Sequence, residues 1–196
     1  MRKKKNEFEK KASNYNLIPI FFMAVSGIIG GILSNSSAIF IDGAFSAVLF
    51  FTIFLGKWIQ LQIIKPKNND YPVGRSRLGS LYVLFKILIL IGILSYSFID
   101  SGFIIIKYAG GNYTPELVDV YYARIYYVVK TIAFIISFAL YTYYLKQTNY
   151  QSTILRVDRK GTVIDGGITL GIMSGFFFLG KIPLVAPISD SIILLF

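Results

Sequence analysis

Long apolar segments alternate with short polar connections along the whole chain. A helix that crosses a bilayer needs about 20 mainly apolar residues, and five segments reach this length if some of them tolerate an embedded charge. A sixth begins near residue 187 and extends for about half the bilayer thickness. We therefore predict an all-α membrane protein, a six-helix transmembrane bundle with its last helix truncated. Its expected spans cover residues 15–34, 37–61, 79–106, 119–145, 154–180 and 187–196. A basic tail over residues 1–14 precedes this transmembrane domain over 15–196.

Two of the expected spans begin with related sequences. The segment 36–42 (SSAIFID) is echoed 116 positions later by the segment 152–158 (STILRVD). The copies begin the second and the fifth spans, and successive spans alternate in direction, so the second copy crosses the membrane in the opposite direction to the first. This pattern is typical of an inverted three-plus-three repeat, and it favours a transporter built by internal duplication.

Composition places the chain in a membrane, and its charge distribution predicts an orientation. Hydrophobic residues make up 55% of the chain and charged residues only 15%, against about 25% charged in soluble domains. The net charge of +10 does not indicate a nucleic-acid partner, because the basic residues lie mainly in the tail and in the connections after the second and fourth spans. The positive-inside rule then places the N-terminus in the cytoplasm. We expect an integral protein of a bacterial plasma membrane, with the lipid bilayer as its first partner.

The chain contains no cysteine and no histidine. Thiolate and imidazole chemistry is therefore excluded, and the commonest zinc ligands are missing. Carboxylates, hydroxyls and backbone carbonyls remain, and these suit harder cations. The sequence also offers no pair of nucleophile and base, so we do not expect an enzyme, and we expect no cofactor.

Acidic and hydroxyl residues share helical faces in two of the apolar spans. Asp42 and Ser46 are four residues apart in the second span, and Asp158, Thr162 and Asp165 have helical spacing in the fifth. In an inverted repeat, Asp42 and Asp165 reach a similar depth, where they could share a cation or a proton. The alternative for Asp165 is a protonated acid bonded to a neighbouring helix. Asp158 lies beside basic residues and is more typical of a structural ion pair.

The first and third spans carry further signals. In the first span, Gly27, Gly30 and Gly31 predict a face that another helix can approach closely, although glycine is common in membrane helices. In the third span, Lys86 and Asp100 lie about 21 Å apart along a helix, too far to pair directly. We expect Lys86 to extend its ammonium toward the membrane surface.

Three segments resemble the cation diffusion facilitator family. The segment 36–43 (SSAIFIDG) is similar to its S-x-A-L-x-A-D-A motif, and 152–165 resembles S-x-x-L-x-A-D-x-x-H-x-x-x-D. The segment 71–77 (YPVGRSR) resembles the loop H-P-[FY]-G-[HY]-G-[KR]. The resemblance covers essentially the whole chain. It implies a six-span domain that exchanges a divalent metal for protons.

The resemblance also implies a metal site, and this chain departs from it. The four ligand positions of the family read Phe45, Leu49, Gly161 and Asp165 here, so a tetrahedral zinc site of the family type cannot form. An oxygen-based site would instead use Asp165 and Asp42, with other oxygen donors completing the shell. The candidate metal residues are Asp165, Asp42, Ser46, Thr162 and Asp158.

Two functions follow from these observations. The first is a proton-coupled secondary transporter that exports a divalent cation such as Mn, Mg, Fe or Zn through a carboxylate-based intramembrane site. The second is a degenerate homologue that no longer transports and acts as an assembly or regulatory subunit. In either case the chain could form a homodimer, or a heterodimer with a related transporter.

Overall fold

The computed structural model describes residues 2–63, 78–111, 115–149, 152–179, 182 and 186–195. All regular elements within these residues are helical. They are α1 (Arg2–Leu33), α2 (Ser37–Ile63), α3 (Leu78–Ala109), α4 (Val120–Gln147), α5 (Thr153–Leu179), the 3₁₀ turn η1 (Ala186–Ile188) and α6 (Ser189–Leu195). In this part of the chain, α1 to α5 are long and apolar enough to cross a membrane, and α6 is shorter. The predicted all-α membrane bundle is confirmed.

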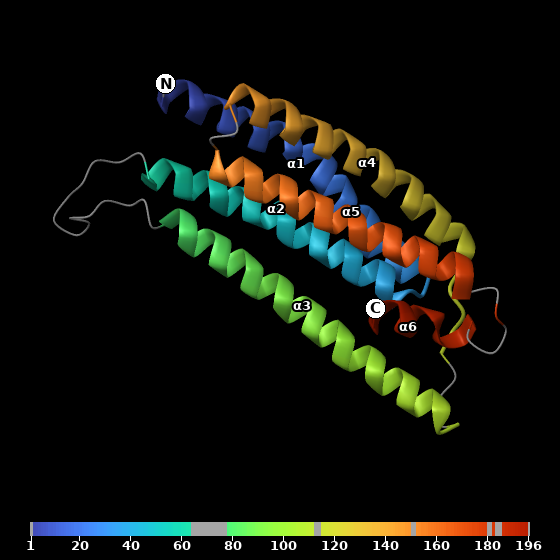
Figure 1. The fold of residues 1–196 in the computed structure, drawn as a ribbon. Coiled ribbons are helices and arrows are strands. Elements are labelled where there is room, and N and C mark those ends of the chain that lie inside the picture. Colours follow the sequence, from blue (N-terminus) through green and yellow to red (C-terminus); the bar gives the residue numbers. More distant parts are fainter. Residues whose placement is uncertain are drawn as a thin grey trace.

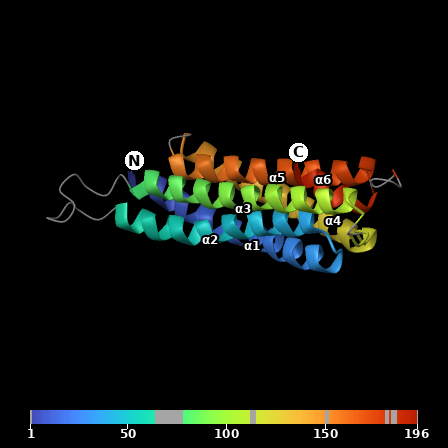
Figure 2. The ribbon, with the colours of Figure 1, turned by 90° about the horizontal axis from the view of Figure 1, so that it is seen from below.

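The helices lie side by side along one common direction (Figures 1 and 2). α1 contacts α2 and α4 along its length, and α5 packs against α4 and α2. α3 lies along one flank, where it contacts mainly α2 and α6. α3 is also the least buried of the long helices, so most of its apolar side chains lie on the outer surface of the bundle.

Glycines in α1 permit close packing on two sides of the helix. A Cβ added at Gly27 would collide with the backbone of Gly43 in α2, and one added at Gly31 would collide with the backbone of Phe40. On another side of α1, a Cβ at Gly30 would lie 3.0 Å from the Cβ of Tyr126 in α4. The predicted close-packing face is confirmed, and it fixes α2 and α4 on either side of α1.

An asparagine with positive φ lies in the turn ahead of each copy, one residue before Ser36 and three residues before Ser152, so the two asparagines are not equivalent positions of the repeat. Asn35 precedes α2 with φ 53° and Asn149 precedes α5 with φ 48°, a left-handed conformation that asparagine tolerates better than most residues. Ser36 and Ser152 then cap the two helices, each accepting the backbone N–H three residues later at 3.1 and 3.2 Å respectively. These two turns lie at opposite ends of the bundle (Figure 1), as an inverted repeat requires.

Candidate functional site

A buried lysine lies at the centre of the polar residues on α2, α4 and α5. The Nζ atom of Lys130 donates to Oδ1 of Asp42 at 3.2 Å, to Oδ1 of Asp165 at 3.0 Å and to the hydroxyl of Ser46. A lysine ammonium has three donors, so all of them are used. The Lys130 side chain is 0% exposed. The geometry is that of a cation held by two carboxylates.

The Asp42 carboxylate accepts two further hydrogen bonds. Its Oδ2 atom accepts from the hydroxyl of Tyr126 and, at 2.8 Å, from the hydroxyl of Thr169. We call this group the Lys130 cluster: Asp42 and Ser46 from α2, Tyr126 and Lys130 from α4, and Asp165 and Thr169 from α5. Every member is buried, so the cluster joins three helices inside the protein.

Asp165 is less completely bonded than Asp42. Its Oδ1 atom accepts from Lys130 and, at 3.0 Å, from Ser46, whereas its Oδ2 atom has no hydrogen-bond partner among the described residues. With Lys130 protonated and both carboxylates ionised, the cluster would have a net charge of −1. Because an uncompensated charge is costly inside a membrane protein, one proton or cation is needed to neutralise it.

A second buried ion pair lies nearer the start of α5. The Nζ atom of Lys86 in α3 is 3.0 Å from Oδ1 of Asp158, and the hydroxyl of Tyr82 donates to the same oxygen at 3.3 Å. We call Tyr82, Lys86 and Asp158 the Lys86 cluster. The Lys86 and Asp158 side chains are 4% and 5% exposed. Asp158 does form an ion pair, but the partner shown is Lys86 of α3 and not one of the basic residues beside it on its own span.

The expectation for Lys86 is wrong. Its side chain turns into the bundle instead of extending to the membrane surface, because a carboxylate on another helix can satisfy its ammonium there. The acid on its own span, Asp100, lies too far along the helix to pair with it. The carboxylate that pairs with it is 72 residues away along the chain.

The structure divides the predicted metal residues between two places. Asp42, Ser46 and Asp165 meet at Lys130, as the shared depth of the two acids predicts. Thr162 instead donates to the backbone carbonyl of Asp158 at 3.1 Å, and Asp158 belongs to the Lys86 cluster. Among the described residues, no group of three or more His, Cys, Asp or Glu side chains could hold a metal ion.

Sequence reasoning missed Lys130 and Tyr126. Both lie in the apolar span that forms α4. Lys130 belongs to no spaced motif, but a charged residue embedded in such a span is a signal in its own right, because it needs a partner there. Tyr126 precedes Lys130 by four residues and so shares its helical face. That spacing would have identified the tyrosine once the lysine had been recognised.

The sequence of this chain matches a family model over most of its length. The model describes the cation efflux transmembrane domain, and it matches residues 15–196. The chain belongs to this family. Its members are metal cation efflux transporters and not enzymes, and the chain is an integral membrane protein. No curated protein matches the sequence. The family-like segment 71–77 lies outside the described residues.

Three of the four ligand positions that the resemblance implies carry residues that pack in the interior and offer no metal-ligating side chain. Phe45 and Leu49 are buried in the hydrophobic core, 2% and 3% exposed. A Cβ added at Gly161 would lie 3.3 Å from Cδ2 of Leu49 and 3.4 Å from Nζ of Lys86. The fourth position, Asp165, keeps its carboxylate but is bonded to Lys130. Apolar side chains and two ammonium groups therefore surround these four positions.

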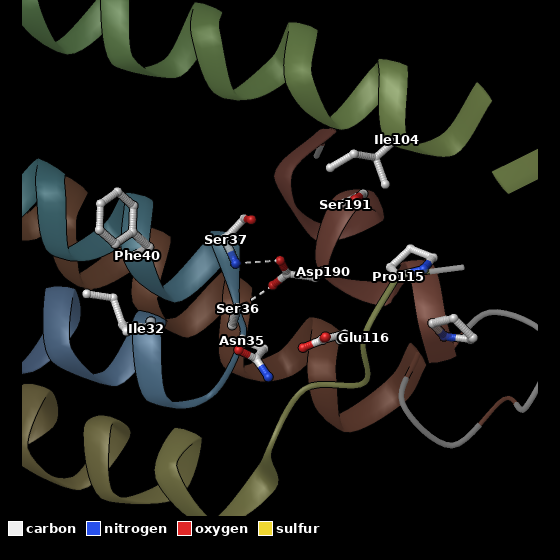
Figure 3. A pocket seen from close by; sticks show the side chains of 12 residues that line it. Ile32, Asn35, Ser36, Ser37, Phe40, Ile104, Pro115, Glu116, Asp190 and Ser191 are labelled. Atoms are coloured by element: carbon white, nitrogen blue, oxygen red, sulfur yellow. Dashed lines mark hydrogen bonds between the residues drawn. The ribbon is translucent and has the colours of Figure 1, made fainter. Parts of the chain in front are cut away.

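A polar cavity lies where α2 begins, next to α6 (Figure 3). Asp190 of α6 accepts from the hydroxyl of Ser36 at 2.6 Å and from the backbone N–H of Ser37 at 2.7 Å. A carboxylate at this position also interacts favourably with the helix dipole. Asn35 and Glu116 line the same cavity, which has a volume of about 510 Å³. Asp190 therefore fastens α6 to the start of α2.

Proposed function

We propose that this protein exports a divalent metal cation in exchange for protons, and that Asp42, Ser46 and Asp165 bind the cation after Lys130 releases them. One observation carries the proposal: a buried ammonium is held between two carboxylates from the two halves of the repeat. In this proposal Lys130 is an internal cation that occupies the site while no metal is bound.

Charge balance gives the stoichiometry of the proposed exchange. Without metal, the site is neutral when Lys130 is an ammonium and one of the two carboxyl groups carries a proton. With a divalent cation, the site is neutral when both carboxylates are ionised and Lys130 is an uncharged amine. The two states differ by two protons, one on Lys130 and one on a carboxyl group. Each cation therefore exchanges for two protons.

The donor atoms favour a hard cation. Carboxylate and hydroxyl oxygens suit Mg²⁺, Mn²⁺ or Ca²⁺, whereas zinc sites usually contain nitrogen or sulfur ligands. Mn²⁺ and Mg²⁺ are therefore preferred to Fe²⁺ and Zn²⁺. Thr162 and Asp158 are outside this proposed site because their polar groups are used elsewhere. The charge distribution supports a cytoplasmic N-terminus in a plasma membrane.

A flux assay tests this function. The full chain is reconstituted in liposomes with a pH gradient, and the movement of Mn²⁺, Mg²⁺, Ca²⁺ and Zn²⁺ is measured. We expect gradient-driven Mn²⁺ or Mg²⁺ flux that Asp165→Asn abolishes. Asp100→Asn is the matched control, since it removes an acid from α3 without touching the site. Absence of flux for every ion, or flux unchanged by Asp165→Asn, contradicts the proposal.

A binding assay tests the role of Lys130. If its ammonium competes with the metal, Lys130→Met should strengthen Mn²⁺ binding to the purified protein by about tenfold, equivalent to about 1.4 kcal/mol. If Lys130 only supports the structure, binding should weaken or stay unchanged. Lys107→Met near the end of α3 is the control. Size-exclusion chromatography checks that each variant remains folded.

A second function, a non-transporting assembly or regulatory subunit, is favoured by the packed ligand positions. Phe45 and Leu49 belong to the hydrophobic core, and Gly161 offers no donor side chain. This alternative expects no flux of any ion from the chain alone. It also expects stable co-purification with a related transporter whose ligand residues are intact, and altered flux through that relative.

A further inference from the structure

The two buried clusters use the same pair of side chains. Tyr82 and Lys86 are four residues apart on α3, and Tyr126 and Lys130 are four residues apart on α4, so each pair lies on one helical face. In both cases the tyrosine hydroxyl and the lysine ammonium bind the same aspartate. The arrangement of a tyrosine and a lysine that bind one aspartate therefore occurs twice in the bundle.

The bound aspartates are equivalent residues of the internal repeat. Asp42 and Asp158 close the related segments 36–42 and 152–158. The lysine from the first half binds the aspartate of the second half, and the lysine from the second half binds that of the first. Because α2 and α5 begin at opposite ends of the bundle (Figure 1), the two ion pairs lie toward opposite ends.

The Lys86 cluster also links two helices that otherwise make little contact. α3 packs mainly against α2 and α6, yet Lys86 and Tyr82 reach Asp158 on α5. Along α5, Asp158 and Asp165 are separated by about 10 Å at helical rise. The Leu49 side chain and the Lys86 ammonium both border the backbone of α5 between these two acids. Separating α3 from α5 would therefore open a route toward Asp165.

We infer that Tyr82, Lys86 and Asp158 form a gate, which closes the end of the bundle where α3 begins and opens when Lys86 releases Asp158. The pair has one ammonium for one carboxylate and so carries no surplus charge, as a closing contact requires. This inference rests on the proposed function, because a gate is needed only if an ion passes. Its test measures the accessibility of a buried residue instead of transport, so the gate and the proposed transport function can each be contradicted independently.

The natural absence of cysteine allows a direct test. Thr162 lies between Asp158 and Asp165 on α5 and is 1% exposed, so Thr162→Cys places a thiol behind the gate. The full chain in liposomes is treated with a membrane-impermeant cationic thiol reagent, added to one side at a time. We expect slow modification from both sides while the gate is closed.

Gate variants should change this rate from one side. Adding Lys86→Met to Thr162→Cys should speed modification by about tenfold or more from the end where α3 begins, since a buried ion pair is broken. Tyr82→Phe should give a smaller increase. Lys107→Met, at the other end of α3, should leave the rate unchanged. An unchanged rate with Lys86→Met, or an equal increase from both sides, overturns the gate.

Two further variants keep the test decisive. If Lys86→Met does not fold, Lys86→Met with Asp158→Asn removes both charges and leaves no buried unpaired carboxylate. This double variant should also speed modification from the same side. If neither it nor Tyr82→Phe does so, the inference is wrong. Lys130→Met should not raise the rate from the end where α3 begins, and an increase there would equally contradict the gate.

Discussion

The Lys130 and Lys86 clusters differ in charge although they are built from the same residue types. The Lys130 cluster has two carboxylates for one ammonium, whereas the Lys86 cluster has one carboxylate for one ammonium. Surplus charge creates a need for a proton or a cation, and balanced charge does not. The comparison therefore supports the proposed roles, ion exchange at the first cluster and closure at the second.

The Lys130 cluster is also more enclosed by neighbouring helices than the Lys86 cluster. α4 is packed against α1 and α5, and its lysine is 0% exposed. α3 lies on the flank of the bundle, and its lysine side chain is 4% exposed. A helix with fewer neighbours moves at lower cost. The Lys86 cluster thus lies where helix movement is easier.

Loss of a lysine should distinguish the clusters most strongly. Lys130→Met leaves two buried carboxylates and should destabilise the protein by about 3–5 kcal/mol. Lys86→Met leaves one carboxylate closer to the end of a helix and should cost less. The measurement is the thermal midpoint in detergent, followed by size-exclusion chromatography. Adding Asp42→Asn to Lys130→Met should recover part of the loss, and equal losses for the two lysines would contradict the comparison.

The two carboxylates of the Lys130 cluster should respond differently to neutralisation. Asp42→Asn weakens three hydrogen bonds, from Lys130, Tyr126 and Thr169, and should cost about 1.5–3 kcal/mol. Either substitution removes the surplus negative charge, but Asp165→Asn weakens only two hydrogen bonds, from Lys130 and Ser46, and should change stability by less than about 1 kcal/mol. Thermal midpoints of the two variants test this. A larger loss for Asp165→Asn would contradict the ranking of the two carboxylates by their hydrogen bonds.

The tyrosines should show a smaller difference. Tyr126→Phe removes a hydrogen bond to a fully buried carboxylate and should cost about 1.5–3 kcal/mol. Tyr82→Phe removes a longer bond of 3.3 Å and should cost about 1 kcal/mol or less. Both side chains keep their rings, so packing is preserved. Similar thermal midpoints for the two variants would mean that the carboxylates are bound equally well.

The fold could be predicted from the sequence because membrane spans depend on local composition. The lengths of the apolar segments predicted where the helices begin and end. The repeated segments 36–42 and 152–158 indicated that α2 and α5 run in opposite directions. The meeting of Asp42 and Asp165 followed from that symmetry. These inferences needed no knowledge of which helices touch.

The partners of the acids could not be predicted in the same way. Lys130 reaches Asp42 and Asp165 from α4, and Lys86 reaches Asp158 from α3. Spacing along one helix identifies a shared face, but it does not say which helix lies opposite that face. A rule that every charge inside a span needs a partner on another helix would have included Lys130.

The smallest predicted difference concerns the serines that begin the two repeats. Ser152→Ala removes a helix cap and should cost about 1 kcal/mol. Ser36→Ala removes the equivalent cap and also the 2.6 Å hydrogen bond to Asp190, so it should cost about 1 kcal/mol more. Ser174→Ala on α5, where the serine is exposed, is the control. Because the two caps are otherwise alike, the difference in thermal midpoint measures the contribution of the hydrogen bond between Ser36 and Asp190, and equal losses would mean that this bond adds nothing to the backbone N–H bond that Asp190 keeps with Ser37.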